Sequence, residues 1–242
     1  MSAEHGCLWS VGVVVPAQNE EKTIQRCIDS VLAAHENCGR ETELWIVVVA
    51  DACSDSTGEL ARDAIGVSGT VIECVSRSPG TARRLGVAAV IEHFHNIRPA
   101  RIWLANTDAD TYVPPDWLKL HLDQADSGAS AVAGIVQLDA SDGLRTDIIR
   151  LYRDTYELRS DGTHGHVHGA NLGVRADAYL DVGGWSHLSV AEDHCLWRRL
   201  KLGGWRLRSC VNSVVVTSAR LHGRALGGFA DTLRGEVEPE HA

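Results

Sequence analysis

Residues 101–110 read RIWLANTDAD, a short apolar run that stops at two carboxylates, Asp108 and Asp110. The apolar part predicts a buried strand, and if strand geometry continues to its end, the two aspartates point to the same side. Paired carboxylates at the end of a strand suit a divalent cation such as Mg²⁺ or Mn²⁺, which keeps positions open for phosphate oxygens. Ligands of α/β proteins also bind at this edge of the sheet. The alternative is a solvated acidic turn, since aspartate is common where strands end.

The chain before this run alternates between short apolar segments and amphipathic ones. Strands are expected at residues 11–15, 44–50 and 71–75 and around Trp103, and helices from Glu20 onward, at 56–65 and at 81–94. Strands that alternate with helices predict parallel pairing. The expected fold class is therefore α/β, with a doubly wound sheet.

The chain after this run is less regular. Helices are expected at residues 115–125, 144–158, 176–182 and 191–202, and strands at 129–137, at 172–174 and within 206–218. A loop at 162–171 carries three histidines at alternate positions, His164, His166 and His168. Because no repeat or linker interrupts the chain, we expect a single domain over residues 1–235. Its first half covers about 11–110 and its second half about 111–225, before a polar tail at 236–242.

Composition excludes several classes of protein. A net charge of −9 over 242 residues argues against a general nucleic-acid binder, which needs a basic face. No apolar run approaches the roughly 18 residues of a membrane span, and no basic segment of a signal peptide opens the chain. The seven cysteines include no C-x-x-C pair, which is typical of reduced thiols. We expect a cytoplasmic protein without an integral membrane segment.

Six segments of the chain together carry a family resemblance. In order, they are VVVPAQNEE from Val13, Asp51 with Ser54 and Asp55, GTARRLG from Gly80, Asp108 with Asp110, the stretch from Gly169 to Trp185, and Glu192 with Asp193. This series resembles family 2 glycosyltransferases with the GT-A fold, a Rossmann-like, mostly parallel sheet that binds a nucleotide sugar. Each match is weak alone, but their common order makes the resemblance specific.

The resemblance implies that residues of about 11–110 form a nucleotide-sugar half and those of about 111–225 an acceptor half. It also implies a nucleotide site. Its residues would be Pro16, Ala17, Glu20, Asp51, Arg83 and Asp108. Asp51 would accept a hydrogen bond from the base, and a carboxylate there pairs with the imide N–H of uracil or guanine. The expected donor is therefore a UDP- or GDP-sugar rather than an ADP-sugar. The alternatives are a turn-capping role for Asp51 and a solvated Arg83, with Arg84 competing for the same role.

The resemblance also implies a metal cofactor, Mn²⁺ or Mg²⁺. Asp110, with Asp108 beside it, would hold the ion that bridges the diphosphate and stabilises charge on the leaving group. His222, just beyond the last strand, is the candidate third ligand. The three histidines of the 162–171 loop are its rivals.

Asp193 is the expected general base, because transfer to a hydroxyl needs a carboxylate within reach of the attacking oxygen. Glu192 would support it, and Gly169, Asn171 and Trp185 would lie on the acceptor side. The alternative is that Glu192 and Asp193 are ordinary acids in the first turn of a helix.

These inferences predict a metal-dependent, inverting glycosyltransferase of the hexosyltransferase type that acts on an acceptor hydroxyl. The Q-x-x-R-W motif of processive synthases is absent, so one sugar per encounter is expected. The alternatives are a retaining transferase of the same fold and a catalytically idle nucleotide-sugar-binding module. A nucleotidyltransferase is disfavoured, because residues 15–20 contain neither glycine nor a cation.

Overall fold

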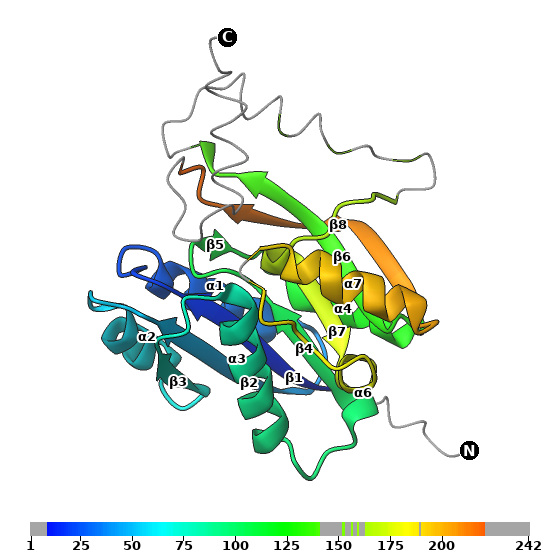
Figure 1. Ribbon diagram of the computed structural model, residues 1–242, viewed down its shortest axis with the longest axis horizontal. Coiled ribbons are helices and arrows are strands. Elements are labelled where there is room, and N and C mark those ends of the chain that lie inside the picture. The colour runs from blue at the N-terminus through cyan, green and yellow to red at the C-terminus, as the bar shows by residue number, and fades with distance from the viewer. Residues whose placement is uncertain are drawn as a thin grey trace.

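Eight strands form one curled, mixed sheet in the order β3-β2-β1-β4-β7-β6-β8-β5 (Figure 1). The computed structural model describes residues 9–140, 152, 156, 159, 163–188 and 190–220, and all structural statements concern these. The strands are β1 (Trp9–Ala17), β2 (Thr42–Asp51), β3 (Gly69–Cys74), β4 (Ile102–Asn106), β5 (Thr111–Tyr112), β6 (Ala131–Leu138), β7 (Leu172–Arg175) and β8 (Leu207–Thr217).

The first four strands of the chain, β1 to β4, are all parallel to one another. β1 lies between β2 and β4, and β3 flanks β2. The carboxyl ends of these strands therefore meet at one edge of the sheet. Because the chain runs outward through β2 and β3 and then returns to the other side of β1, a crevice is expected between β1 and β4.

The remaining strands make the sheet mixed. β7 pairs antiparallel with both β4 and β6, and β5 pairs antiparallel with β8. β6 and β8 run parallel, with a register shift between Gly134 and Ile135. The prediction of a mostly parallel sheet is confirmed. The two-residue strand β5 was not predicted, because so short a segment has no periodicity.

Helices cover both faces of the sheet. One face packs against α1 (Ile24–Glu36), α2 (Thr57–Ile65) and α4 (Trp117–Asp126), and the other against α3 (Pro79–His93), α6 (Ala176–Asp181) and α7 (Glu192–Leu202). Two short 3₁₀ helices, η1 (Pro99–Arg101) and η3 (Gly169–Asn171), complete the described elements. Strand β1 alternates between these two cores, with Val13 facing the first and Val14 the second.

Close packing of α3 on β1 depends on glycine. A Cβ atom at Gly12 would lie 2.1 Å from Val90, and one at Gly86 would lie 2.4 Å from Val14. Helix α3 therefore lies close to the sheet, and Ser78 caps its first turn by accepting a hydrogen bond from the Thr81 N–H. This packing fixes the first turn of α3 beside the crevice.

Within the described residues, expected and observed elements agree except at their ends and at β5, η1 and η3, which were not predicted. β1 continues through Pro16, because its pairing with β4 ends at Val14 and no strand on that side needs the missing N–H. The helix expected at 144–158 lies almost entirely outside the described residues, as does His222. None of the described helices is long and apolar enough to cross a membrane.

Candidate active site

Backbone strain marks the carboxyl edge of the sheet. Four non-glycine residues have positive φ within the described ranges: Asn19, Ala52, Arg77 and Ala191. The first three follow β1, β2 and β3, and Ala191 directly precedes α7. Such residues cost roughly 1–3 kcal/mol each and gather where surrounding contacts hold a functional geometry.

Asp51 ends β2 and holds the loop that leads into α3. Its Oδ2 accepts hydrogen bonds from Ser76 Oγ (2.7 Å) and the Ser78 N–H (3.0 Å), and its Oδ1 accepts one from the Arg77 N–H (2.9 Å). Burial opposes ionisation, but these three bonds outweigh it and hold the pKa of Asp51 below its ordinary value. The carboxylate therefore performs the turn-holding role, and one lone pair of Oδ1 remains for a ligand.

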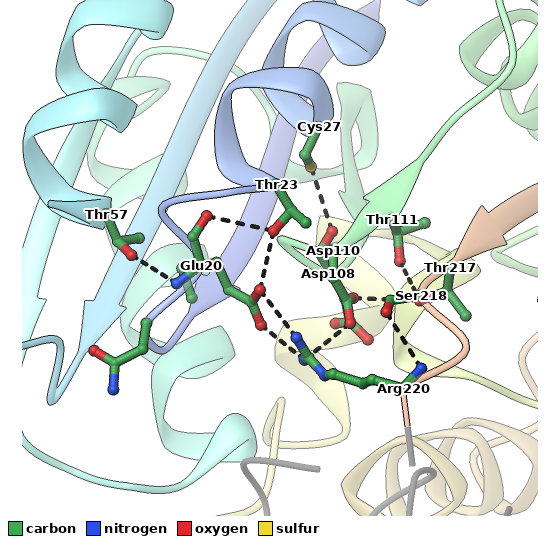
Figure 2. A network of polar contacts seen from close by, with 12 residues as sticks. Glu20, Thr23, Cys27, Thr57, Asp108, Asp110, Thr111, Thr217, Ser218 and Arg220 are labelled. Carbon is green, nitrogen blue, oxygen red and sulfur yellow. Dashed lines mark hydrogen bonds and ion pairs between the residues drawn. The ribbon is translucent and has the colours of Figure 1, made fainter. Parts of the chain in front are cut away.

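Glu20 is buried just beyond β1, near Pro16 and Ala17. Its N–H donates to Thr57 Oγ1 (2.6 Å), which ties the loop after β1 to the start of α2. Its carboxylate accepts a hydrogen bond from Thr23 Oγ1 (2.9 Å). The side chain thus points toward the crevice rather than away from it (Figure 2).

Arg83 joins two of the predicted motifs. Only 3% of the residue is exposed, and its guanidinium forms ion pairs with Asp108 and with Glu192 Oε1 (2.9 Å). Its guanidinium also lies 5.4 Å from the ring centre of Trp185. The neighbouring Arg84 has different partners and donates to the carbonyls of residues 183 and 185.

The two aspartates of the D-x-D motif have different arginine partners. β4 ends at Asn106 and the chain then turns, so the expected strand alternation does not extend to Asp108 and Asp110. Asp110 Oδ1 accepts from Thr217 Oγ1 (3.2 Å), and its Oδ2 lies 2.9 Å from Arg220 Nη2. Burial, together with the charges of Asp108 and Glu20, raises the pKa of Asp110 to about 6, although Arg220 opposes the shift.

The donor atoms at this edge have the chemistry that a hard divalent cation requires. Asp108, Asp110 and Glu20 offer carboxylate oxygens, the ligands preferred by Mg²⁺ and Mn²⁺. Across the part of the chain that the structure describes, no three histidine, cysteine or acidic residues are arranged as a complete metal site. A bound ion would therefore need ligands from the substrate or from beyond these residues. His164, His166 and His168 instead surround Tyr156.

Asp193 is held in one orientation by the backbone. Its Oδ2 accepts a hydrogen bond from the Gly169 N–H (2.9 Å) and its Oδ1 one from the His194 N–H (2.7 Å). Glu192, beside it, is buried against Arg83, and burial raises the pKa of Glu192 although the arginine opposes the shift. The E-D pair is thus connected through Arg83 to Asp108. The sequence alone gave no indication of this connection.

Asn171 and Trp185 lie in the protein interior. Asn171 Oδ1 accepts hydrogen bonds from Trp117 Nε1 (2.9 Å), His121 Nε2 (3.2 Å) and Ser213 Oγ (3.2 Å). Its amide donates to the carbonyls of residues 135 and 213. Trp185 is fully buried in the core on the α3 side of the sheet. Both residues pack in the protein interior next to the site, and neither is exposed at its surface.

Arg220 is the site residue that sequence reasoning missed. It follows β8 and forms ion pairs with Glu20 and Asp110, two residues from opposite walls of the crevice. The sequence pattern predicted a metal ligand in this segment, His222, and no role for Arg220. An arginine two residues away from that histidine was the available signal.

Comparison with known proteins identifies the family. A family model described as "Glycosyl transferase family 2" matches residues 12–183, more than half of the chain. This chain belongs to glycosyltransferase family 2. The match spans the D-x-D motif and both sides of the crevice, so the predicted family and enzyme class are confirmed.

One curated relative of this glycosyltransferase is the undecaprenyl-phosphate 4-deoxy-4-formamido-L-arabinose transferase of Edwardsiella ictaluri (strain 93-146). The two are 27% identical over 132 residues, which is 54% of this chain and 38% of the relative. The chain thus spans well under half the length of that protein.

Solved structures show the same fold. The S. aureus TarS fragment 1–349 in complex with UDP has a TM-score of 0.64 at 17% identity, over 87% of this chain and 61% of that one. The mannosyltransferase PcManGT from Pyrobaculum calidifontis, in complex with GDP-Man and Mn²⁺, has a TM-score of 0.66 at 20% identity, over 88% and 58%. The GT-A architecture predicted for this family 2 member is confirmed.

Proposed function

We propose that this glycosyltransferase moves one sugar from a nucleotide-diphosphate sugar to an acceptor hydroxyl, with a divalent cation and with inversion at the anomeric carbon. The observation that carries the proposal is the ion-pair chain from the half-buried Asp108 through the buried Arg83 to the buried Glu192. It couples the carboxylate expected near the donor diphosphate to the pair that contains the candidate base. Breaking one link leaves a buried charge without its partner.

The donor site in this proposal lies across the carboxyl ends of β1 and β2. Pro16 and Ala17 form its wall, and Asp51 shapes its floor and offers one remaining lone pair to the imide N–H of a base. The UDP and GDP-Man bound to the two structural neighbours support a uridine or guanosine donor. We therefore expect UDP- or GDP-sugars to bind and ADP-sugars to bind poorly.

The metal in this proposal is held by Asp110 and Asp108. Their hard oxygen donors fit Mn²⁺ or Mg²⁺, and the Mn²⁺ bound in the mannosyltransferase neighbour supports this assignment. When bound, such an ion stabilises negative charge on the departing diphosphate. His222 stays our candidate for a further ligand.

Asp193 acts as the general base in this proposal. The N–H groups of Gly169 and His194 orient its two oxygens, so the carboxylate is preorganised to accept a proton from the acceptor hydroxyl. The deprotonated oxygen attacks the anomeric carbon as the bond to the nucleotide diphosphate breaks. Attack from the face opposite the leaving group inverts the configuration. Gly169 lines the acceptor side, while Asn171 and Trp185 position it from the interior.

Donor binding and product stereochemistry test the proposal. The purified protein is titrated with UDP-, GDP- and ADP-sugars in the presence of Mn²⁺, and the anomeric configuration of the product is read by NMR. We expect binding of a UDP- or GDP-sugar and a product with the opposite configuration. A retained configuration would remove the need for Asp193 as a base, and a protein that binds a donor but never turns it over would be an idle module.

A further inference from the structure

Arg220 places a positive charge between Asp110, a ligand in the proposed metal site, and the neighbouring Glu20. Its Nη2 lies 2.7 Å from Glu20 Oε1 and 2.9 Å from Asp110 Oδ2, and its Nη1 lies 3.0 Å from Glu20 Oε2. Figure 2 shows the guanidinium between the carboxylates of Glu20 and Asp110. No role in the proposed reaction uses this residue.

The two carboxylates need a cation where they lie. The Glu20 side chain is 6% exposed and the Asp110 side chain 11% exposed. Buried carboxylates without a partner are strongly unfavourable, so a positive group between them stabilises the pair. Arg220 supplies that charge in the structure, and a divalent cation would supply it in the loaded enzyme.

The arginine and a divalent ion cannot both use Asp110 without repulsion. An ion bound to Oδ2 at roughly 2.1 Å would lie within about 5 Å of the guanidinium nitrogen that contacts the same oxygen. Two cations at such a distance repel each other strongly in a site that holds little water.

The anchoring of Arg220 allows the exchange. The Ser218 N–H donates to the Asp110 carbonyl (3.2 Å) and the Arg220 N–H to Ser218 Oγ (3.3 Å), so the backbone is held on the D-x-D turn. The side chain contacts Glu20 at two points but Asp110 at one. It can therefore release Asp110 and keep its bidentate pairing with Glu20.

We propose that Arg220 is an internal counter-ion of the metal site, which offsets one of the two negative charges of Asp110 and Glu20 while no divalent cation is bound and releases Asp110 when one binds. The inference rests on the proposed metal dependence. Arg220 then controls the affinity for the divalent cation. The ion binds by displacing the guanidinium from Asp110 and does not fill an open site.

Metal binding to the protein without nucleotide tests the inference. Free Mn²⁺ is measured by electron paramagnetic resonance during titration of the native protein, of Arg220→Gln and of Arg220→Lys. We expect Arg220→Gln to bind Mn²⁺ at least tenfold more tightly than the native protein, because the competing charge is gone. Arg220→Lys keeps a positive charge but cannot form the bidentate pair with Glu20, so its Mn²⁺ affinity should lie between those of the native protein and Arg220→Gln.

Arg40→Gln is the matched control, since Arg40 also pairs with two carboxylates, Asp123 and Asp126, but lies away from the crevice. It should leave Mn²⁺ affinity unchanged, and adding Asp110→Asn to Arg220→Gln should abolish the gain. Equal or weaker binding by Arg220→Gln, or a gain that survives Asp110→Asn, would overturn the inference. Donor turnover by the native protein with Mn²⁺ and with chelator is measured separately, so failure of the proposed function is recognised independently.

Discussion

Gly169 illustrates how closely the site is built at the scale of single residues. A Cβ atom there would lie 2.5 Å from Arg83 Nη2 and 2.7 Å from its Cζ, while the Gly169 N–H holds Asp193. Arg83 cannot move aside cheaply, because Asp108 and Glu192 hold its guanidinium on both sides. Because residue 169 has no side chain, Arg83 has room to bridge Asp108 and Glu192, and the Gly169 N–H can still orient Asp193.

Gly169→Ala should therefore lower transfer by more than tenfold, because the added methyl displaces Arg83 and loosens Asp193. Steady-state kinetics on the folded variant measures the loss. Gly165→Ala is the matched control in the same loop, since its Cβ would meet no atom closer than 3.9 Å. Equal activity of the two variants would show that the arginine bridge is dispensable.

Asp193→Asn should leave donor binding nearly intact and lower transfer by roughly 10²–10⁴, the usual contribution of a positioned base. The amide keeps the shape of the carboxylate but cannot take the proton of the acceptor. Calorimetry measures donor affinity and a product assay measures the rate. Asp181→Asn, at the end of α6 and bonded to Trp205, is the acidic control. Native transfer rates in Asp193→Asn would refute the assignment.

At the scale of elements, one buried amide joins four parts of the acceptor half. Asn171 lies in η3 and exchanges hydrogen bonds with α4, β6 and β8. Since Trp103 Nε1 donates to His121 Nδ1 (3.4 Å), the other ring nitrogen of His121 donates to Asn171. The network sets the position of the segment that begins at Gly169.

Asn171→Ala should destabilise the protein by about 3 kcal/mol or more, because several buried donors and acceptors lose their partner together. Urea unfolding measures the change in the free energy of unfolding. Asn96→Ala, at an exposed position, should change it little. A stable Asn171→Ala protein with impaired transfer would instead indicate direct contact with the acceptor.

The same network predicts a pH dependence of stability. Burial lowers the pKa of His121 to about 4, so the folded state keeps it neutral. Its unfolded pKa is about 6.5, so the unfolded state binds the extra proton between roughly pH 6.5 and pH 4. The contribution of neutral His121 to the free energy of unfolding is fully present above pH 6.5, and about 3 kcal/mol of it is lost as the pH falls to 4. The slope of unfolding free energy with pH should be shallower in His121→Gln, and an unchanged slope would contradict the prediction.

At the scale of the whole molecule, the sheet order brings distant residues to one crevice. Glu20 follows β1, the D-x-D turn follows β4, and Arg220 follows β8, yet the three lie within ion-pair distance (Figure 2). Parallel pairing of β1 with β4 and antiparallel pairing of β8 with β5 place these ends together. The site is thus a property of the complete sheet.

Nucleotide-diphosphate affinity should depend on a divalent cation at this crevice. Asp110→Ala should weaken Mn²⁺-dependent binding of a nucleotide diphosphate by more than tenfold, or about 1.4 kcal/mol, because a metal ligand is lost. Calorimetry with Mn²⁺ and with chelator measures the difference. Equal affinity of the native protein in both conditions would exclude a metal at this site.

The sequence by itself determined the α/β class, nearly all element positions and the family, because strand and helix periodicity and the order of short motifs are local properties. It also indicated Asp51, the D-x-D aspartates and the E-D pair as site candidates, since each follows a strand or opens a helix. It could not place β7 antiparallel between β4 and β6, because the spacing of apolar residues indicates a strand but not which strands pair with it.

Only the tertiary structure decided which partner each charged side chain has. Arg83 rather than Arg84 joins Asp108 to Glu192, and Asn171 serves the interior network. Arg220 meets Glu20 across 200 residues of chain. These choices follow from the burial of charges and amides, which must find partners wherever the folded sheet brings them, however far apart they lie in sequence.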